Sequence, residues 1–160
     1  MPNEVVDDEQ LTTYLARHAV REIAPQEMPL FRANAEAYFK DPQRALAGSR
    51  SGDDMLGFGG GVEVVLLTPV ALAVAREVAR FVLGEFAKVV AKEAVGQARE
   101  VVTSFLAGKR GGAASTPPPL THAQLEAVHD VAYTAALRLL LPEGRARVLA
   151  DSTVGALALA

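Results

Sequence analysis

The chain has 160 residues, 50% of them hydrophobic, and its 16 basic and 19 acidic residues give a formal charge of −3. This size and apolar content predict one domain, or one domain with an appendage, and exclude disorder throughout the chain. The near-balanced charge argues against nucleic acid as a partner, and the lack of cysteine excludes disulfides, thiol nucleophiles and cysteine-ligated metal sites.

The N-terminal part of the chain predicts two helices. Residues 1–10 are acidic and lack the apolar run of a secretory signal, so we expect a cytoplasmic location. The first helix is predicted to begin after Asp7 or Asp8 and to stop at Pro25, because proline cannot continue a helix. A second, shorter helix is predicted over about 26–39.

Residues 41–61 are predicted to form a long connection, because they are rich in glycine, serine and charge. A phosphate-binding loop needs a strand before its glycines and a lysine with a hydroxyl residue after them, and this segment has neither. A flexible hinge is therefore the favoured interpretation of the glycines, which are Gly57, Gly59, Gly60 and Gly61.

One long helix is predicted over 69–107. Thr68 can serve as its N-cap, Pro69 suits the first helical position, and no residue interrupts the pattern before Gly108. At about 1.5 Å per residue this helix would be roughly 58 Å long, more than the roughly 40 Å diameter of a compact chain of this size. A straight helix would therefore extend beyond its own domain.

The apolar face of this long helix changes sides partway along. Val74, Val78 and Val82 share one face in the first half, whereas beyond about residue 91 the apolar residues lie on the opposite side. The shift is too abrupt for the drift of a heptad pattern, which is about 20° per heptad. Two interpretations stay open, a break or hinge at Gly96 and a continuous rod with two partners. The second face consists of Val95, Ala98, Val101, Val102 and Phe105.

The C-terminal part of the chain predicts a linker and a helical hairpin. Glycines and three consecutive prolines indicate an extended spacer over 108–120. Thr121 and Gln124 match a capping box that opens a helix reaching about Leu141, and Pro142 restarts the chain into a final helix. The predicted organisation is a helical bundle over 1–107, the linker 108–120 and the hairpin 121–160.

Three residues of the hairpin share one helical face and have spacing that can hold a metal: His122, Glu126 and His129. Glu126 and His129 match the Glu-x-x-His element of two-metal bundles, but such a site needs a second element, which the sequence lacks. We therefore expect no metal or other cofactor, and interpret His129 as a core histidine with one hydrogen-bond partner. Its neighbour Asp130 points about 100° away on a helix, so the pair does not indicate a catalytic triad.

No diagnostic family motif and no Gly-x-Ser-x-Gly elbow are present, so the sequence does not predict an enzyme. We expect an all-α protein, a bundle of about five helices built around one long central helix that is either continuous or kinked near Gly96. The predicted function is that of a non-enzymatic adaptor or scaffold, which docks a protein partner or forms a homo-oligomer through the second face of the long helix.

The alternative function is membrane insertion or perturbation by the apolar segment 62–90, released through the glycine hinge. A helix that spans a membrane needs about 20 apolar residues. The longest run without a charged residue in the segment 62–90 is shorter than that. Liposome binding and leakage would separate this alternative from the adaptor.

Overall fold

The computed structural model describes residues 2–50, 66–90 and 120–158. Within these ranges the regular elements are six α-helices and one 3-10 helix, with no strand, which confirms the predicted all-α class. The described ranges contain one α-helix more than the predicted count of about five. The additional helix lies in 42–50, inside a segment that was predicted to be a connection.

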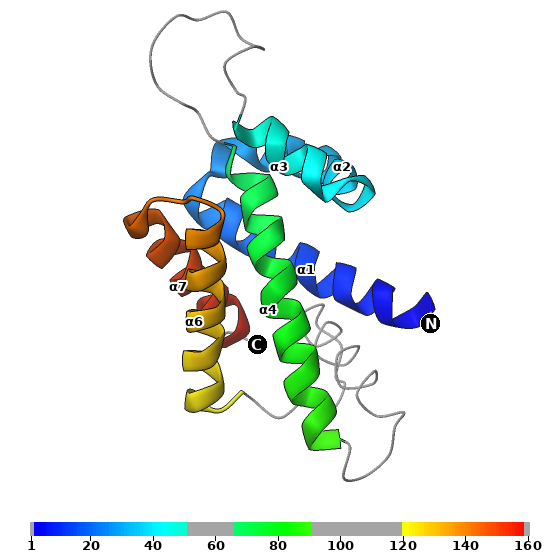
Figure 1. The fold of residues 1–160 in the computed structure, drawn as a ribbon, viewed down its shortest axis with the longest axis vertical. Coiled ribbons are helices and arrows are strands. Elements are labelled where there is room, and N and C mark those ends of the chain that lie inside the picture. Colours follow the sequence, from blue (N-terminus) through cyan, green and yellow to red (C-terminus); the bar gives the residue numbers. More distant parts are fainter. Residues whose placement is uncertain (1, 51–65, 91–119, 159–160) are drawn as a thin grey trace, which may run out of the picture.

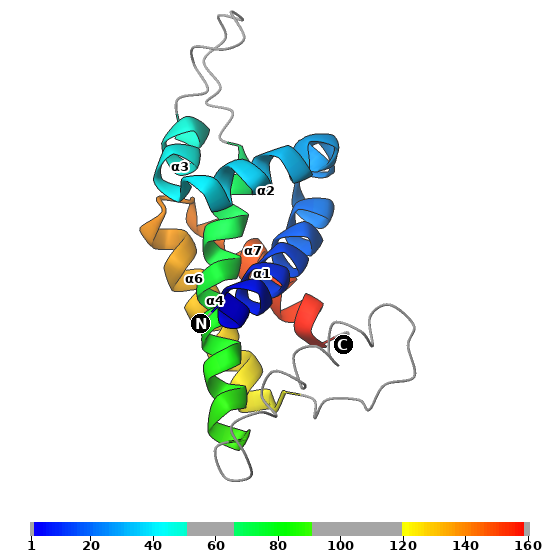
Figure 2. The ribbon, with the colours of Figure 1, turned by 90° about the vertical axis from the view of Figure 1, so that its right-hand side faces the viewer.

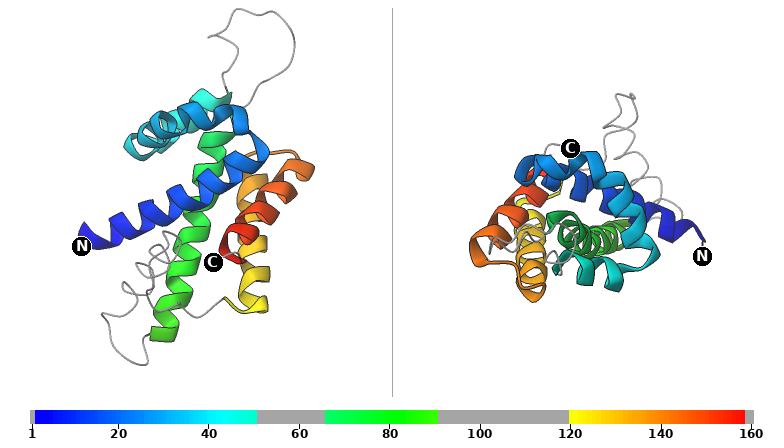
Figure 3. Two further views of the ribbon diagram at one scale, coloured as in Figure 1. Left: turned by 180° about the vertical axis from the view of Figure 1, so that it is seen from behind. Right: turned by 90° about the horizontal axis from the view of Figure 1, so that it is seen from above.

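Helix α4 (Leu67–Val90) is the central element of the fold. On one side α1 (Pro2–Ile23) crosses it, and on another side lies the hairpin of α6 (His122–Arg138) and α7 (Glu143–Ala158) (Figure 1). These four longest helices touch in a closed ring, because α1 packs on α4, α4 on α6, α6 on α7 and α7 on α1. Seen from above, α4 is surrounded by the other helices (Figure 3).

The hydrophobic core lies between the four helices of this ring. The face of α4 that carries Val74, Val78 and Val82 is buried, with exposed fractions of 0%, 0% and 1%. Ala71, Ala75 and Ala79 of the same helix are also buried, so small side chains let its neighbours approach closely. The largest fully buried apolar side chains of the described residues are Leu11, Leu15 and Val20 of α1, Leu72, Val74, Val78 and Val82 of α4, Val128 of α6 and Leu149 of α7.

The N-terminal elements differ from the prediction at two boundaries. Helix α1 begins at Pro2, before Asp7, because neither proline nor glycine follows Pro2 until Pro25 and proline is well tolerated in a first turn. The predicted helix 26–39 is divided into the 3-10 helix η1 (Pro25–Leu30) and α2 (Phe31–Lys40). The reason is the spacing of Pro25 and Pro29, since an α-helix would need a hydrogen bond that Pro29 cannot donate.

The prediction of a connection over 41–61 is wrong for its first half, where α3 (Pro42–Arg50) forms. Asp41 caps this helix, because its Oδ1 accepts a hydrogen bond from the backbone N–H of Arg44 at 3.1 Å. Pro42 stands in the first helical position, where a missing N–H costs nothing. The pair of Asp41 and Pro42 was therefore a start signal that the glycine and serine content of the segment obscured.

The prediction that Thr68 caps the central helix is also wrong. Helix α4 already includes Leu67, and its first amides are satisfied by Glu27 of η1. The backbone N–H groups of Leu67 and Thr68 donate to the Glu27 carboxylate, each at 2.8 Å, and the Thr68 hydroxyl donates to it at 2.6 Å. The predicted continuation of this helix over 91–107, with the break or hinge at Gly96, lies outside the described residues.

Helices α6 and α7 pack against each other, and the predicted capping box at the start of α6 is confirmed. Thr121 Oγ1 accepts from the Gln124 N–H at 3.2 Å, and Gln124 Oε1 accepts from the Thr121 N–H at 2.9 Å. Helix α6 ends at Arg138, three residues before the predicted Leu141, in a turn that holds Leu140 at a positive φ of 64°. The Leu140 N–H donates to Leu137 O at 3.0 Å and the Leu141 N–H to Ala136 O at 3.1 Å, which is the Schellman pattern.

The two parts of the chain that flank the predicted linker 108–120 are in contact, since the hairpin packs on both α1 and α4. An ion pair between Arg138 of α6 and Glu77 of α4 lies on this interface. Among the helices that the structure describes, none combines the length and the apolar character needed to cross a bilayer.

Candidate functional site

The predicted docking face and the predicted hinge fall outside the described residues. The face consists of Val95, Ala98, Val101, Val102 and Phe105, and the hinge of Gly57, Gly59, Gly60, Gly61 and Gly96. The candidate sites that the structure does describe are polar clusters where two or three helices meet.

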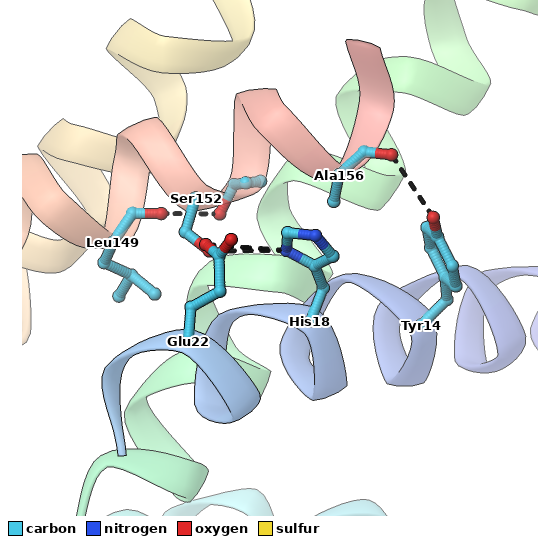
Figure 4. A network of polar contacts seen from close by, with 7 residues as sticks. Tyr14, His18, Glu22, Leu149, Ser152 and Ala156 are labelled. Atoms are coloured by element: carbon cyan, nitrogen blue, oxygen red, sulfur yellow. Dashed lines mark hydrogen bonds and ion pairs between the residues drawn. The ribbon is translucent and has the colours of Figure 1, made fainter. Parts of the chain in front are cut away.

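The first cluster joins α1 to α7 and contains His18, Glu22 and Ser152 (Figure 4). A spacing of four residues puts His18 and Glu22 on one face of α1, opposite Ser152 of α7. The Ser152 hydroxyl donates to Glu22 Oε2 at 2.6 Å, and its oxygen lies 3.4 Å from His18 Nδ1. His18 Nδ1 and Glu22 Oε2 are 3.8 Å apart. Ser152 is buried, whereas the Glu22 side chain is 54% exposed.

This cluster has the residue types of a serine-histidine-carboxylate relay but not its order. A relay places the histidine between the other two, with one ring nitrogen on the serine and the second on the carboxylate. Here the same nitrogen of His18 faces both partners, and Ser152 donates directly to Glu22. The arrangement therefore cross-links α1 and α7. The Tyr14 hydroxyl adds a second link farther along, donating to Ala156 O at 3.3 Å.

The second cluster lies where α1 crosses α4 close to α2, and it contains Asp8, Tyr38, Arg76 and Arg80. Asp8 Oδ2 is 3.8 Å from the Nε atoms of both arginines. The Asp8 side chain is 16% exposed, so this carboxylate is largely withdrawn from water. Burial raises the pKa of Tyr38 above its usual value. A hydrogen bond to Arg76 and the positive charge of that arginine lower the pKa, but by less than burial raises it.

The third cluster lies between α6 and α7 around His129. Its Nε2 is 3.2 Å from Asp151 Oδ1, and its ring stacks on Tyr133 with centroids 6.2 Å apart. The other ring nitrogen, Nδ1, is 3.8 Å from Asp130 Oδ1, so His129 faces two carboxylates and not the single partner that was predicted. Its side chain is 34% exposed and lies at the edge of the core.

The candidate metal ligands of the hairpin are not brought together. His122 Nε2 faces Glu126 Oε1 at 3.2 Å on the exposed side of α6, whereas His129 faces Asp151. Within the described ranges, no group of three or more histidine, aspartate or glutamate side chains has the geometry to hold a metal ion. The structure therefore gives the metal hypothesis no support.

No family model, no curated protein and no solved structure matches this chain. Function must consequently be argued from the residues themselves, because no relative supplies a reaction, a ligand or a partner.

Proposed function

We propose that this protein is a non-enzymatic helical adaptor or scaffold that binds a protein partner, or a second copy of itself, through the second face of its long helix. The observation that carries this proposal is that the first apolar face of α4 is already buried within the chain. Val74, Val78 and Val82 of α4 are fully buried against helices of the same chain. The first apolar face is therefore already occupied within the bundle.

The sequence that follows α4 places its apolar residues on the opposite side. If the helix continues, Val95, Ala98, Val101, Val102 and Phe105 form a face that cannot use the same neighbours. Exposing a face of this kind to water is unfavourable, at about 25 cal/mol per Å² of apolar surface. A partner helix that covers the face removes that cost, and this is the physical basis of the proposed association.

The polar clusters of the described residues support a non-catalytic role. Ser152, His18 and Glu22 connect α1 to α7 without the order that proton transfer through the histidine would require. Asp8 lies between two arginines at a helix crossing. Both arrangements hold neighbouring helices in fixed relative positions. An adaptor depends on such a fixed arrangement to present its binding face.

The proposal predicts that charge on the second face abolishes association without unfolding the protein. The test is the double variant Val102→Glu and Phe105→Glu, measured by light scattering on a size-exclusion column and by circular dichroism. We expect a lower absolute mass at unchanged helix content.

The matched control for this test is Val78→Glu on the first face of the same helix. A carboxylate at this fully buried position is expected to destabilise the fold by several kcal/mol and to lower helix content. If the double variant unfolds in the same way as the control, Val102 and Phe105 belong to the core and the proposed interface is wrong.

The membrane alternative requires a larger rearrangement. Release of 62–90 would bring Leu72, Val74 and Val78 out of the core, where each is fully buried. Dye leakage from liposomes on addition of the wild-type protein would favour this alternative over the adaptor.

A further inference from the structure

The turn between α6 and α7 and the first turns of α7 carry exposed apolar side chains. Of the five exposed large hydrophobic residues in the described ranges, three lie within 137–148. Leu137 and Leu140, at the end of α6, are 39% and 75% exposed, and Val148, in the second turn of α7, is 50% exposed. In Figure 2 this turn, in orange, lies toward the end of the molecule that carries α2 and α3, and the yellow start of α6 lies toward the opposite end.

The same stretch is basic, although the chain as a whole is acidic. Residues 137–148 contain three arginines and one glutamate, whereas the whole chain has a formal charge of −3. Arg138 pairs with Glu77 of α4. Arg145 and Arg147 are exposed and have no ion-pair partner within the described ranges. The packing of the bundle therefore leaves two positive charges available beside the apolar side chains.

Two residues of this stretch contribute little to the stability of the fold. Leu140 has a positive φ of 64°, a conformation that leucine rarely adopts, while most of its side chain is in contact with water. Arg145 lies in the first turn of α7, where a positive charge opposes the helix dipole. A strained backbone that packing does not explain points to a functional role for the residue. A contact outside the chain explains leucine at this position better than packing within it.

We propose that the hairpin turn binds an acidic segment of a protein partner. Apolar side chains of the segment cover Leu140 and Val148, and its carboxylates pair with Arg145 and Arg147, whose planar guanidinium groups match carboxylate geometry. Arg145 and Val148 are three residues apart on α7, so a charged contact and an apolar contact lie side by side on the helix surface. The residues of this surface, which we name the hairpin-turn surface, are Leu137, Leu140, Arg145, Arg147 and Val148.

The number of available charges favours a protein segment over an anionic membrane or nucleic acid. Polybasic segments that bind acidic lipids carry about four to eight lysines or arginines, and nucleic-acid binding depends on many phosphate contacts. The hairpin-turn surface has two arginines without an ion-pair partner in the described ranges, on a chain of net charge −3. Two carboxylates of a peptide segment match that number.

This inference goes beyond the proposed function, because the hairpin-turn surface shares no residue with the second face of the long helix over 95–105. An adaptor joins two molecules, so it needs two separate binding surfaces. The light-scattering test of Val102 and Phe105 and the peptide-binding test below change different residues. Either proposal can therefore fail while the other stands.

The test is a selection from a display library of random peptides on the full chain, followed by calorimetric titration of the selected peptides. We expect these peptides to combine acidic with apolar residues, and their binding to weaken about tenfold in the double variant Arg145→Glu and Arg147→Glu. The matched control is Arg21→Glu with Arg44→Glu, which reverses two exposed arginines on α1 and α3. The control should bind the peptides as the wild-type protein does.

A second variant, Leu140→Gly, separates binding from folding. Glycine suits the positive φ of this position, so the variant should unfold at a higher urea concentration than the wild-type protein. We expect it to bind the selected peptides about tenfold more weakly, because the apolar contact is lost. Leu30→Ala is the control, since Leu30 is 63% exposed but lies outside the hairpin-turn surface. It should leave peptide binding unchanged.

Four results would overturn the proposal. The selection enriches no peptide, or it enriches peptides that bind the double arginine variant as tightly as the wild-type protein. The wild-type protein binds vesicles of phosphatidylglycerol and phosphatidylcholine, and the double arginine variant does not, which would identify an anionic membrane as the ligand. The double arginine variant has a lower absolute mass than the wild-type protein, which would identify a second copy of the chain as the partner.

Discussion

At the residue scale, Leu140 occupies a backbone conformation that leucine rarely adopts. Its φ of 64° lies in the left-handed region at the end of α6, where glycine is usual because it lacks a Cβ atom. The Leu140 side chain is 75% exposed, so little burial offsets the conformational cost.

Replacing this leucine with glycine should therefore stabilise the protein. We expect Leu140→Gly to raise the free energy of unfolding by about 0.5–1 kcal/mol, measured by urea denaturation. The same substitution three positions earlier, Leu137→Gly, places glycine inside a right-handed helix and should cost about 1 kcal/mol or more. If both variants lose stability equally, the strain assigned to Leu140 is absent.

A second residue-scale prediction concerns alkaline pH and Tyr38. Burial raises the pKa of Tyr38 in the folded protein above 10.0, so folding favours the neutral phenol. This contribution to stability is complete below the unfolded pKa and is lost as the pH rises through the folded pKa. We expect the wild-type stability to decrease more steeply above about pH 10 than that of Tyr38→Phe, measured by urea midpoints at several pH values. Parallel pH profiles for the two proteins would contradict this assignment.

At the element scale, the start of α4 depends on a side chain 40 residues away. The buried Glu27 carboxylate accepts three hydrogen bonds from Leu67 and Thr68, at the positive end of the helix dipole. This contact joins η1 directly to the first turn of α4.

Neutralising this cap should destabilise the protein clearly. Glu27→Gln keeps the shape but loses the charge and turns an amide donor toward the helix donors, so we expect a loss of about 2–3 kcal/mol in urea denaturation. Glu36→Gln serves as the control, because its partner Arg32 is 91% exposed and the pair should contribute less than about 0.5 kcal/mol. A Glu27→Gln variant as stable as the control would show that the cap is not needed.

The elements that could be predicted from sequence are those defined by local signals. Pro25 ends α1, the capping box of Thr121 and Gln124 opens α6, and Pro142 precedes α7. The errors have two different origins. Asp41 with Pro42 is a local signal that was outweighed by composition, whereas the Glu27 cap of α4 depends on a distant residue.

The polar clusters were less predictable than the helices. Ser152 meets Glu22 across 130 residues of sequence, and His129 meets Asp151 of the next helix. Helical periodicity shows which face of a helix is polar, but not which polar residue of another helix it meets. Only the tertiary packing of α1, α6 and α7 decides those pairs.

At the scale of the whole molecule, four helices close a ring and bury the first face of α4 within it. We propose that a protein partner or a second copy of the chain covers the predicted second face over 95–105. These residues lie outside the described ranges, so the proposal is tested on the intact protein in solution.

The most direct measurement is the absolute mass of the purified protein, by light scattering on a size-exclusion column across a dilution series. If the partner is a second copy of the chain, we expect a defined oligomer for the wild-type protein and a folded particle of lower mass for the variant with Val102→Glu and Phe105→Glu. A wild-type protein that is monomeric at every concentration, together with a double variant that loses its helix content, would show that Val102 and Phe105 are core residues and not an interface.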